Sequence, residues 1–304
     1  MPRRLPRIAI ATIALASAAL LVGACTPEVR GDPPAATEQR PPAPAAPPQA
    51  PPFVQQTAPF DGLEARIAQA TAEAADAGAD IEVVILDRET GQRLSNGVDT
   101  PIPIASVVKL FIADDLLMRA AEDETELSPA DQASLDSMLR SSDDGAAQAF
   151  WNRNGRSAIV SRIVGRYGLT GTTKPYNDSK WDVTQSTASD LVRYYDMLLS
   201  GAGGLPPEQA EIIVGDLARF TPSGLDGYPQ RFGIPDGLPG ETVAVKQGWF
   251  CCWNGGNQLH VSTGIIGPDR RYVMAIGSLD PTSAATARAN ITQAVKTMFP
   301  AGRI

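Results

Sequence analysis

The sequence predicts an α+β fold, an α/β sandwich in which terminal helices flank an antiparallel five-stranded sheet and an all-α region is inserted. Three observations predict it. One helix and two strands come first, a run of helices fills the middle of the chain, and three strands and a helix come last. Because strand segments lie on both sides of the helical block, they can pair in a single sheet.

The first elements are indicated by their apolar periodicity. An apolar stripe that ends at Gly78 predicts a helix over 61–77. The β-branched run over 81–87 and a shorter segment over 93–96, separated by a turn containing Gly91, predict a hairpin. Two prolines then precede a helix that we expect to span about 104–121.

The rest of the chain separates into a helical block and a strand block. Helices are expected at 129–140, 144–152, 157–167 and 187–200, strands at 243–252, 258–266 and 272–278, and a final helix at 283–299. The Asn254-Gly255-Gly256 turn predicts a hairpin between the first two of these strands. The expected domain therefore covers 61–304, with a sheet part (61–105 and 205–304) and a helical part (106–204).

The N-terminal segment predicts secretion. Arginines precede an apolar stretch over 8–22, too short to cross a bilayer comfortably, so residues 1–24 are expected to be a signal peptide. The stretch ends in a sequence that resembles a bacterial lipobox, which implies cleavage before Cys25 and its lipidation. Residues 25–60 are then a lipidated cysteine and a Pro/Ala-rich tether. An ordinary secreted protein or an uncleaved anchor is the alternative.

Charge and composition exclude several function classes. The formal net charge is −8, so nucleic acid is not an expected partner. No metal site or cofactor is expected, because the cysteines are few and His260 is the only histidine. His260 is expected to be a core or edge residue of a strand, with a catalytic base as the alternative. The adjacent Cys251 and Cys252 can form a vicinal disulfide or stay as thiols on opposite faces of the strand. We expect the thiols, because a trans peptide sets the two Cα atoms closer together than a disulfide usually allows.

Three short clusters carry the chemistry. Ser106 and Lys109 are three residues apart at an expected helix start, so the amine can act on the hydroxyl proton. Ser142 opens a Ser-Asp-Asp cluster, and Lys246 opens a Lys-Gln-Gly cluster on an expected strand. The order S-x-x-K, S-D-N, K-T-G belongs to class A β-lactamases and penicillin-binding proteins, and two of the three clusters here carry one altered residue each.

The chain resembles this serine hydrolase family in motifs and in element order over 61–304. The resemblance implies Ser106 as nucleophile, Lys109 as base and Ser142 as proton relay. It further implies that Asp144, Lys246, Gln247, Gly248 and Trp249 bind substrate, Lys246 by holding an anionic group and Trp249 through its backbone N–H in an oxyanion hole. The implied ligand is a peptidoglycan peptide or another anionic small molecule.

Four departures predict weak β-lactam hydrolysis or none. Asp144 replaces an asparagine, and its carboxylate is expected to pair with Lys109. Gln247 replaces a hydroxyl residue, and no glutamate occurs between Leu127 and Pro207 to activate water. Trp249 and its aromatic neighbours Phe250 and Trp253 have enough bulk to fill the pocket, and structural packing is the equally good alternative explanation for them.

Two functional hypotheses remain. The first is an envelope lipoprotein that forms an acyl-enzyme at Ser106, anchored through Cys25 on the extracytoplasmic face of the cell membrane. The second is an inactive pseudoenzyme that serves as a binding or scaffold module in the envelope. In its lipobox, tether and altered motifs, the chain resembles the β-lactamase-like envelope lipoproteins of mycobacteria.

Overall fold

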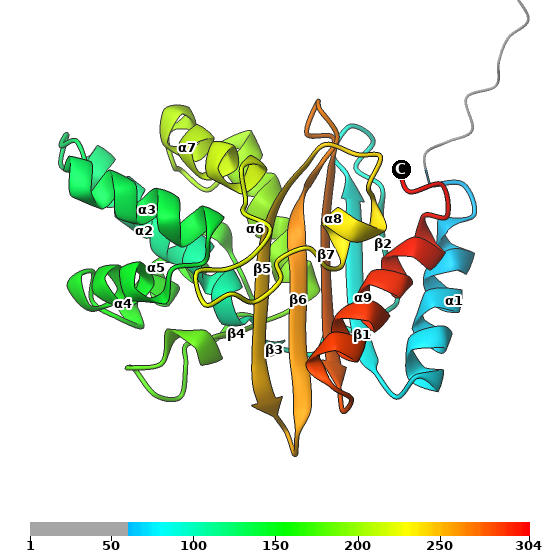
Figure 1. Cartoon of the computed structure of the whole chain (residues 1–304). Coiled ribbons are helices and arrows are strands. Elements are labelled where there is room, and N and C mark those ends of the chain that lie inside the picture. The colour runs from blue at the N-terminus through cyan, green and yellow to red at the C-terminus, as the bar shows by residue number, and fades with distance from the viewer. Residues whose placement is uncertain (1–59) are drawn as a thin grey trace, which may run out of the picture. The chain divides into compact units, whose positions relative to one another are not determined.

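The computed structural model describes residues 60–304 (Figure 1). Its α-helices are α1 (Leu63–Asp76), α2 (Lys109–Glu122), α3 (Pro129–Arg140), α4 (Asp144–Arg153), α5 (Ala158–Tyr167), α6 (Ala188–Ser200), α7 (Pro207–Ala218), α8 (Ile234–Gly237) and α9 (Ala284–Met298). Its strands are β1 (Asp80–Asp87), β2 (Arg93–Ser95), β3 (Ile102–Pro103), β4 (Gln185–Ser186), β5 (Val243–Trp253), β6 (Asn257–Ile266) and β7 (Tyr272–Asp280). Two 3₁₀ turns, η1 (Ala105–Val108) and η2 (Trp181–Val183), complete the order.

The predicted five-stranded antiparallel sheet is confirmed. Its strand order is β2-β1-β7-β6-β5, and every neighbouring pair is antiparallel. The N-terminal hairpin joins the sheet through β7, where Val84 pairs with Ala275. Segments at opposite ends of the domain thus form adjacent strands, and β5 is left at the edge beside the helical part.

The sheet buries both of its faces. On one face, α1 and α9 lie side by side and bury Leu63, Ile67, Ile291 and Val295 against the strands (Figure 1). On the other face, α6 packs on β7 and β1 and the rest of the helical block surrounds α2. Burial of apolar surface in these two clusters drives folding.

Side-chain caps explain where several helices begin. The side chains of Ser128, Asp143, Thr187 and Ser283 accept hydrogen bonds from backbone N–H groups in the first turns of α3, α4, α6 and α9. The Asp143 cap fixes the start of α4, which places its two sequence neighbours, Ser142 and Asp144, at the end of the helical block nearest β5.

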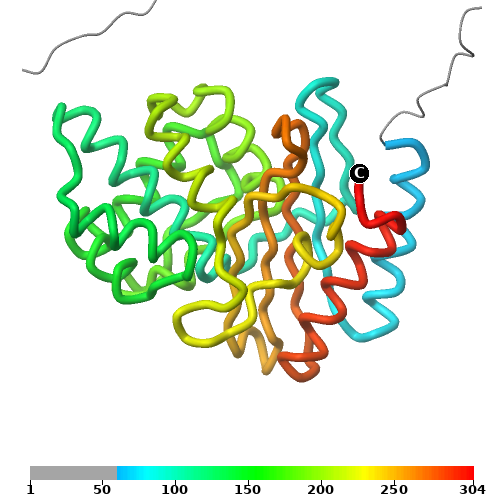
Figure 2. Tube along the Cα trace, turned by 45° about the horizontal axis from the view of Figure 1, so that its top comes forward, coloured from blue at the N-terminus to red at the C-terminus, as the bar shows by residue number. Residues whose placement is uncertain are grey.

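Several segments differ from the sequence-based expectation, among them the short elements β3, β4 and α8, which were not predicted. Ser106 lies in the 3₁₀ turn η1, and the α-helix begins only at Lys109. Helix α7 was not predicted, because its start at Pro207 and its internal Gly215 obscure its periodicity; proline is nevertheless compatible with the first helical turn. After α7, residues 219–242 cross β5 and β6 before β5 begins (Figure 2).

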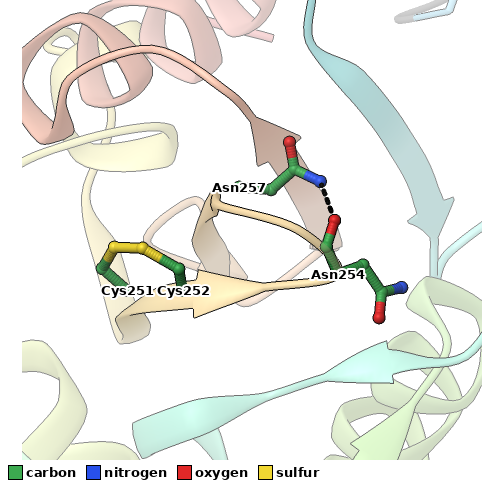
Figure 3. Close-up of a disulfide and its surroundings, with 4 residues drawn as sticks. All are labelled: Cys251, Cys252, Asn254 and Asn257. Carbon is green, nitrogen blue, oxygen red and sulfur yellow. Dashed lines mark hydrogen bonds between the residues drawn. A yellow bond between two sulfur atoms is a disulfide. The ribbon is translucent and has the colours of Figure 1, made fainter.

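The expectation of two free thiols at the end of β5 is wrong. Cys251 and Cys252 are joined in a disulfide (Figure 3), and the peptide bond between them is cis, so the trans spacing assumed for the sequence does not apply. The predicted turn that follows is present, and the side chain of Asn257 donates to the carbonyl of Asn254 across it.

The signal peptide, Cys25 and the tether lie outside the residues that the structure describes. Within 60–304, no helix is long and apolar enough to cross a membrane. In the same range, no three His, Cys, Asp or Glu side chains gather as a metal site.

A buried ionic cluster holds the helical block together. The Asp114 carboxylate is fully buried on α2 and accepts hydrogen bonds from the Arg166 guanidinium and the Tyr167 hydroxyl of α5 and, at 3.1 Å, from Tyr194 of α6. Burial raises the pKa of Asp114, and Arg166 opposes that shift. One carboxylate therefore joins three helices, and it depends on its partners for compensation.

We expect Arg166→Leu to lower the free energy of unfolding by about 3–5 kcal/mol, because it leaves a buried carboxylate without its cation. Urea unfolding followed by circular dichroism measures the change. As a control, Arg153→Leu breaks the more exposed pair with Asp131 and should cost at most about 1 kcal/mol. Equal losses in the two variants would contradict the role given to Asp114.

Candidate functional site

The Ser106 hydroxyl is presented by a short, constrained turn. η1 follows β3 directly, and Ala105 within it has φ 46°, in the left-handed region that residues with a side chain rarely adopt. Ser106 is 7 % exposed, and it faces a cleft in the surface. The turn thus presents one hydroxyl to solvent at the start of α2.

Lys109 connects the candidate residues to one another. Its amine lies 2.7 Å from Ser106 Oγ, 2.8 Å from the Ser142 carbonyl oxygen and 2.6 Å from Asp144 Oδ1. A fourth, longer contact of 3.2 Å reaches Ser142 Oγ. Because Lys109 is fully buried while the Asp144 side chain is 71 % exposed, the ion pair lies at the boundary between protein and cleft.

Ser142 lies between two lysines. Its backbone φ of 58° turns the chain between α3 and α4, and its Oγ lies 2.8 Å from the Lys246 amine of β5. The structure therefore brings Ser106, Lys109, Ser142 and Lys246 together in a continuous hydrogen-bonded cluster. These residues come from η1, α2, the turn before α4, and the edge strand.

The two amines have different electrostatic environments. Burial lowers the pKa of Lys109, and the Asp144 carboxylate opposes this shift. Burial lowers the pKa of Lys246 well below its ordinary value, and the charge of Lys109 lowers it further. Within residues 60–304, the hydrogen-bond partners of the Lys246 amine are Ser142 Oγ and, at 3.3 Å, the carbonyl of Gln247. A neutral Lys246 can accept a hydrogen bond from Ser142, as a proton relay would require.

Gly248 allows the edge strand to approach η1. A Cβ on Gly248 would lie 2.4 Å from the carbonyl oxygen of Ile104, so any side chain would force the strand away. The close approach brings the Trp249 backbone to the segment that carries Ser106. Glycine is needed here for space, since its φ is not in the left-handed region.

The Gln247 side chain is committed to the interior. It is 1 % exposed, and its Nε2 donates to the carbonyl oxygens of Gln230 at 3.0 Å and Phe232 at 2.6 Å. The amide thus fastens the segment that crosses β5 and does not line the cleft. Of the five residues predicted to bind substrate, Asp144 and Trp249 line the cleft, whereas Lys246, Gln247 and Gly248 do not.

The cleft over Ser106 is open. Its volume is about 490 Å³, and its walls are formed by Ala105, Ser106, Asp144, Gln148, Ser179, Lys180, Trp181, Asp182, Asp226, Trp249 and Phe250. The idea that aromatic bulk fills the pocket is wrong, because Trp249 and Phe250 form its wall and Trp253 does not line it. The Trp249 ring stacks on Tyr228 with centroids 4.9 Å apart, which holds it to the side.

His260 contacts Tyr228, the residue on which the Trp249 ring stacks. Its Nε2 lies 2.7 Å from the Tyr228 hydroxyl, it is fully buried, and burial lowers its pKa to about 4. His260 is therefore neutral at physiological pH and does not line the cleft.

Sequence reasoning missed several residues of the cleft, among them Trp181 and Asp226. The Trp181 ring lies 4.7 Å from the Lys109 amine, a cation–π distance, and Asp226 accepts from Trp249 Nε1 at 3.2 Å. Neither residue lies at a fixed spacing from the three clusters, so the sequence contains no signal for them. Two acids lie in the loop between α5 and α6: Asp182 lines the cleft, whereas Asp178 accepts from the backbone N–H of Ser157.

Solved structures share this fold. The TLA-3 extended-spectrum β-lactamase matches with a TM-score of 0.64 and 15% identity, over 80% of this chain and 98% of its own. A class A β-lactamase from Mycobacterium abscessus matches with a TM-score of 0.61 and 22% identity, over 78% of this chain and 98% of its own. The fold is therefore that of the class A β-lactamases.

Relatives in sequence identify the family, whereas the solved structures identify only the fold. No protein-family model matches the chain. Proteins of Mycobacterium tuberculosis and Mycobacterium bovis, both named "Putative lipoprotein LppW", are 59% identical over 245 residues, which cover 81% of this chain and 77% of each relative. The chain therefore belongs to the LppW family of mycobacterial lipoproteins, with a β-lactamase-like fold.

Proposed function

We propose that the cleft performs acyl transfer through a Ser106 acyl-enzyme. The observation that carries the proposal is the 2.7 Å contact between the buried Lys109 amine and Ser106 Oγ, at the open end of the cluster that includes Ser142 and Lys246. Neutral Lys109 takes the hydroxyl proton as Ser106 attacks the acyl carbon, and the relay through Ser142 returns a proton to the leaving group. The N–H groups of Ser106 and Trp249 are the proposed oxyanion donors.

We expect deacylation to be slower than acylation, so that the acyl-enzyme is long-lived. No glutamate occurs between Leu127 and Pro207, and of the two acids in the loop between α5 and α6, Asp178 and Asp182, only Asp182 lines the cleft. A water above an acyl-Ser106 would therefore have no strong base in the position that class A enzymes use. We propose slow turnover of acyl compounds and little or no β-lactam hydrolysis.

The second candidate is a pseudoenzyme that binds ligand without turnover. The Lys109–Asp144 ion pair favours it, because a charged Lys109 cannot take the Ser106 proton. The open cleft would then bind a ligand reversibly. The two candidates differ in one measurable property, the formation of a covalent adduct.

Incubation of the purified protein with a fluorescent penicillin or a 4-nitrophenyl ester should give an adduct at Ser106 that persists for hours, detected by intact mass and peptide mapping. Ser106→Ala should form none, and Ser142→Ala should acylate about 100-fold more slowly, because its proton relay is lost. Labelling of the native protein no greater than that of Ser106→Ala would favour the pseudoenzyme.

Asp144→Asn should move the pH profile of acylation to lower pH. Asp144 raises the pKa of Lys109, so its removal lowers that pKa further and neutral Lys109 becomes available at lower pH. The measurement is the acylation rate of a neutral ester between pH 6 and pH 10. An unchanged or alkaline-shifted profile would exclude Lys109 as the base.

We further propose that Cys25 carries the lipid anchor on the extracytoplasmic side of the membrane, supported by the lipobox-like sequence and by the relatives' name as lipoproteins. Expressed in a mycobacterium, the protein should incorporate radiolabelled palmitate and partition with membranes. Cys25→Ala should lose the label and leave the membrane fraction, while Cys251→Ala with Cys252→Ala should retain both. Equal labelling of the two variants would refute the anchor site.

A further inference from the structure

The side chains expected to hold an anionic ligand are engaged within the protein. The Lys246 amine is 1 % exposed and bonds to Ser142 Oγ, and the Gln247 amide donates to two main-chain carbonyls. Neither lines the cleft. Binding a carboxylate there would require breaking bonds of the catalytic cluster or of the segment that crosses β5.

The walls of the cleft carry mainly negative charge. Asp144, Asp182 and Asp226 line it, and Lys180 is the one lysine or arginine among the lining residues. Within 60–304, neither Asp182 nor Asp226 forms an ion pair with any cation. Even with Lys109 charged beside Asp144, the carboxylates of the lining outnumber the cations. A cationic group in the cleft therefore gains Coulomb energy that an anion loses.

Asp226 is held in place before any ligand arrives. Its carboxylate accepts from the indole N–H of Trp249 at 3.2 Å and from the backbone N–H of Tyr228 at 2.9 Å. Trp249 is fixed in turn by its stack on Tyr228, whose ring also lies under the guanidinium of Arg288. The wall thus combines a positioned carboxylate with a positioned indole.

The aromatic rings favour the same sign of charge. Trp181, Trp249 and Phe250 line the cleft together with the three carboxylates. Aromatic faces attract ammonium and guanidinium groups, and the attraction grows as the cation loses water. Carboxylates and aromatic rings in one cleft are the combination that binds alkylated ammonium groups.

We infer that this cleft selects acyl compounds carrying an ammonium or guanidinium group, in place of the anionic ligand that the family resemblance implies. The inference rests on the proposed function for its acyl chemistry, but its charge preference is a property of binding. The cationic group lies against Asp182, Asp226 and the aromatic wall while the acyl carbon meets Ser106.

Three 4-nitrophenyl esters of matched length test the inference on the full-length protein in a neutral detergent. The cationic probe is the ester of 6-(trimethylammonio)hexanoate, the neutral isostere is that of 7,7-dimethyloctanoate, and the anionic probe is the monoester of heptanedioate. We expect the second-order rate constant of acylation to be about 10-fold higher for the cationic ester than for the neutral isostere. The anionic ester should react more slowly than the isostere.

Asp226→Asn and Asp182→Asn should each reduce the ratio of cationic to neutral rates about threefold, since each removes one wall charge. Lys180→Met should increase that ratio. Asp178→Asn is the matched control, because it removes a charge from the same loop at a residue that does not line the cleft, and it should keep the native ratio. A ratio that is insensitive to the wall variants would overturn the inference.

Equilibrium binding separates this inference from the proposed function. In Ser106→Ala, tryptophan fluorescence should report hexyltrimethylammonium binding with a Kd about 10-fold lower than that of heptanoate, and added salt should weaken it. If no ester acylates Ser106 but the cation binds, the proposed function fails and the charge preference stands. If the esters acylate Ser106 without preference, the charge preference fails and the function stands. Absence of cation binding would also refute the preference.

Discussion

The buried amine of Lys109 is the group on which the site depends. Removing an ammonium group from water is costly unless acceptors replace the lost hydration, and here two hydroxyls, a carbonyl and a carboxylate surround it. Each acceptor comes from a segment whose position the fold must fix: η1, the turn after α3, and the start of α4. The requirement to satisfy one buried amine with hydrogen bonds thus orders the backbone around the cleft, whether or not the site turns over substrate.

The second constraint is the contact between the sheet and the helical block. Gly248 lets β5 approach the carbonyl of Ile104, which brings Lys246 within reach of Ser142. Residues 219–242 then cover the strand and are fastened by the Gln247 amide. Gln247, which replaces the hydroxyl residue of the family motif, therefore has a structural role. The cleft correspondingly lacks a donor that would have favoured an anionic ligand.

Much of the fold was predictable because its signals are local. Apolar periodicity located α1, the helices before α7, and α9, and the glycine-rich turn located the β5–β6 hairpin. The candidate site was indicated by three motifs, although sequence alone could not show that Lys246 and Gln247 face inward. Trp181 and Asp226 were missed because loops bring them to the cleft, and loop paths follow from tertiary packing. The sequence also contains no signal for the cis peptide bond between Cys251 and Cys252.

Ala105 and Ser142 adopt left-handed backbone conformations without being glycine, and each is at or beside a hydroxyl of the cluster. Such conformations cost about 1–3 kcal/mol apiece and persist only when surrounding packing enforces them. The protein therefore gives up folding free energy at the two points where its hydroxyls are presented. Selection for thermal stability alone would favour substitutions that remove the backbone strain at Ala105 and Ser142. If both residues are retained in a library of variants, that retention indicates selection on the cleft.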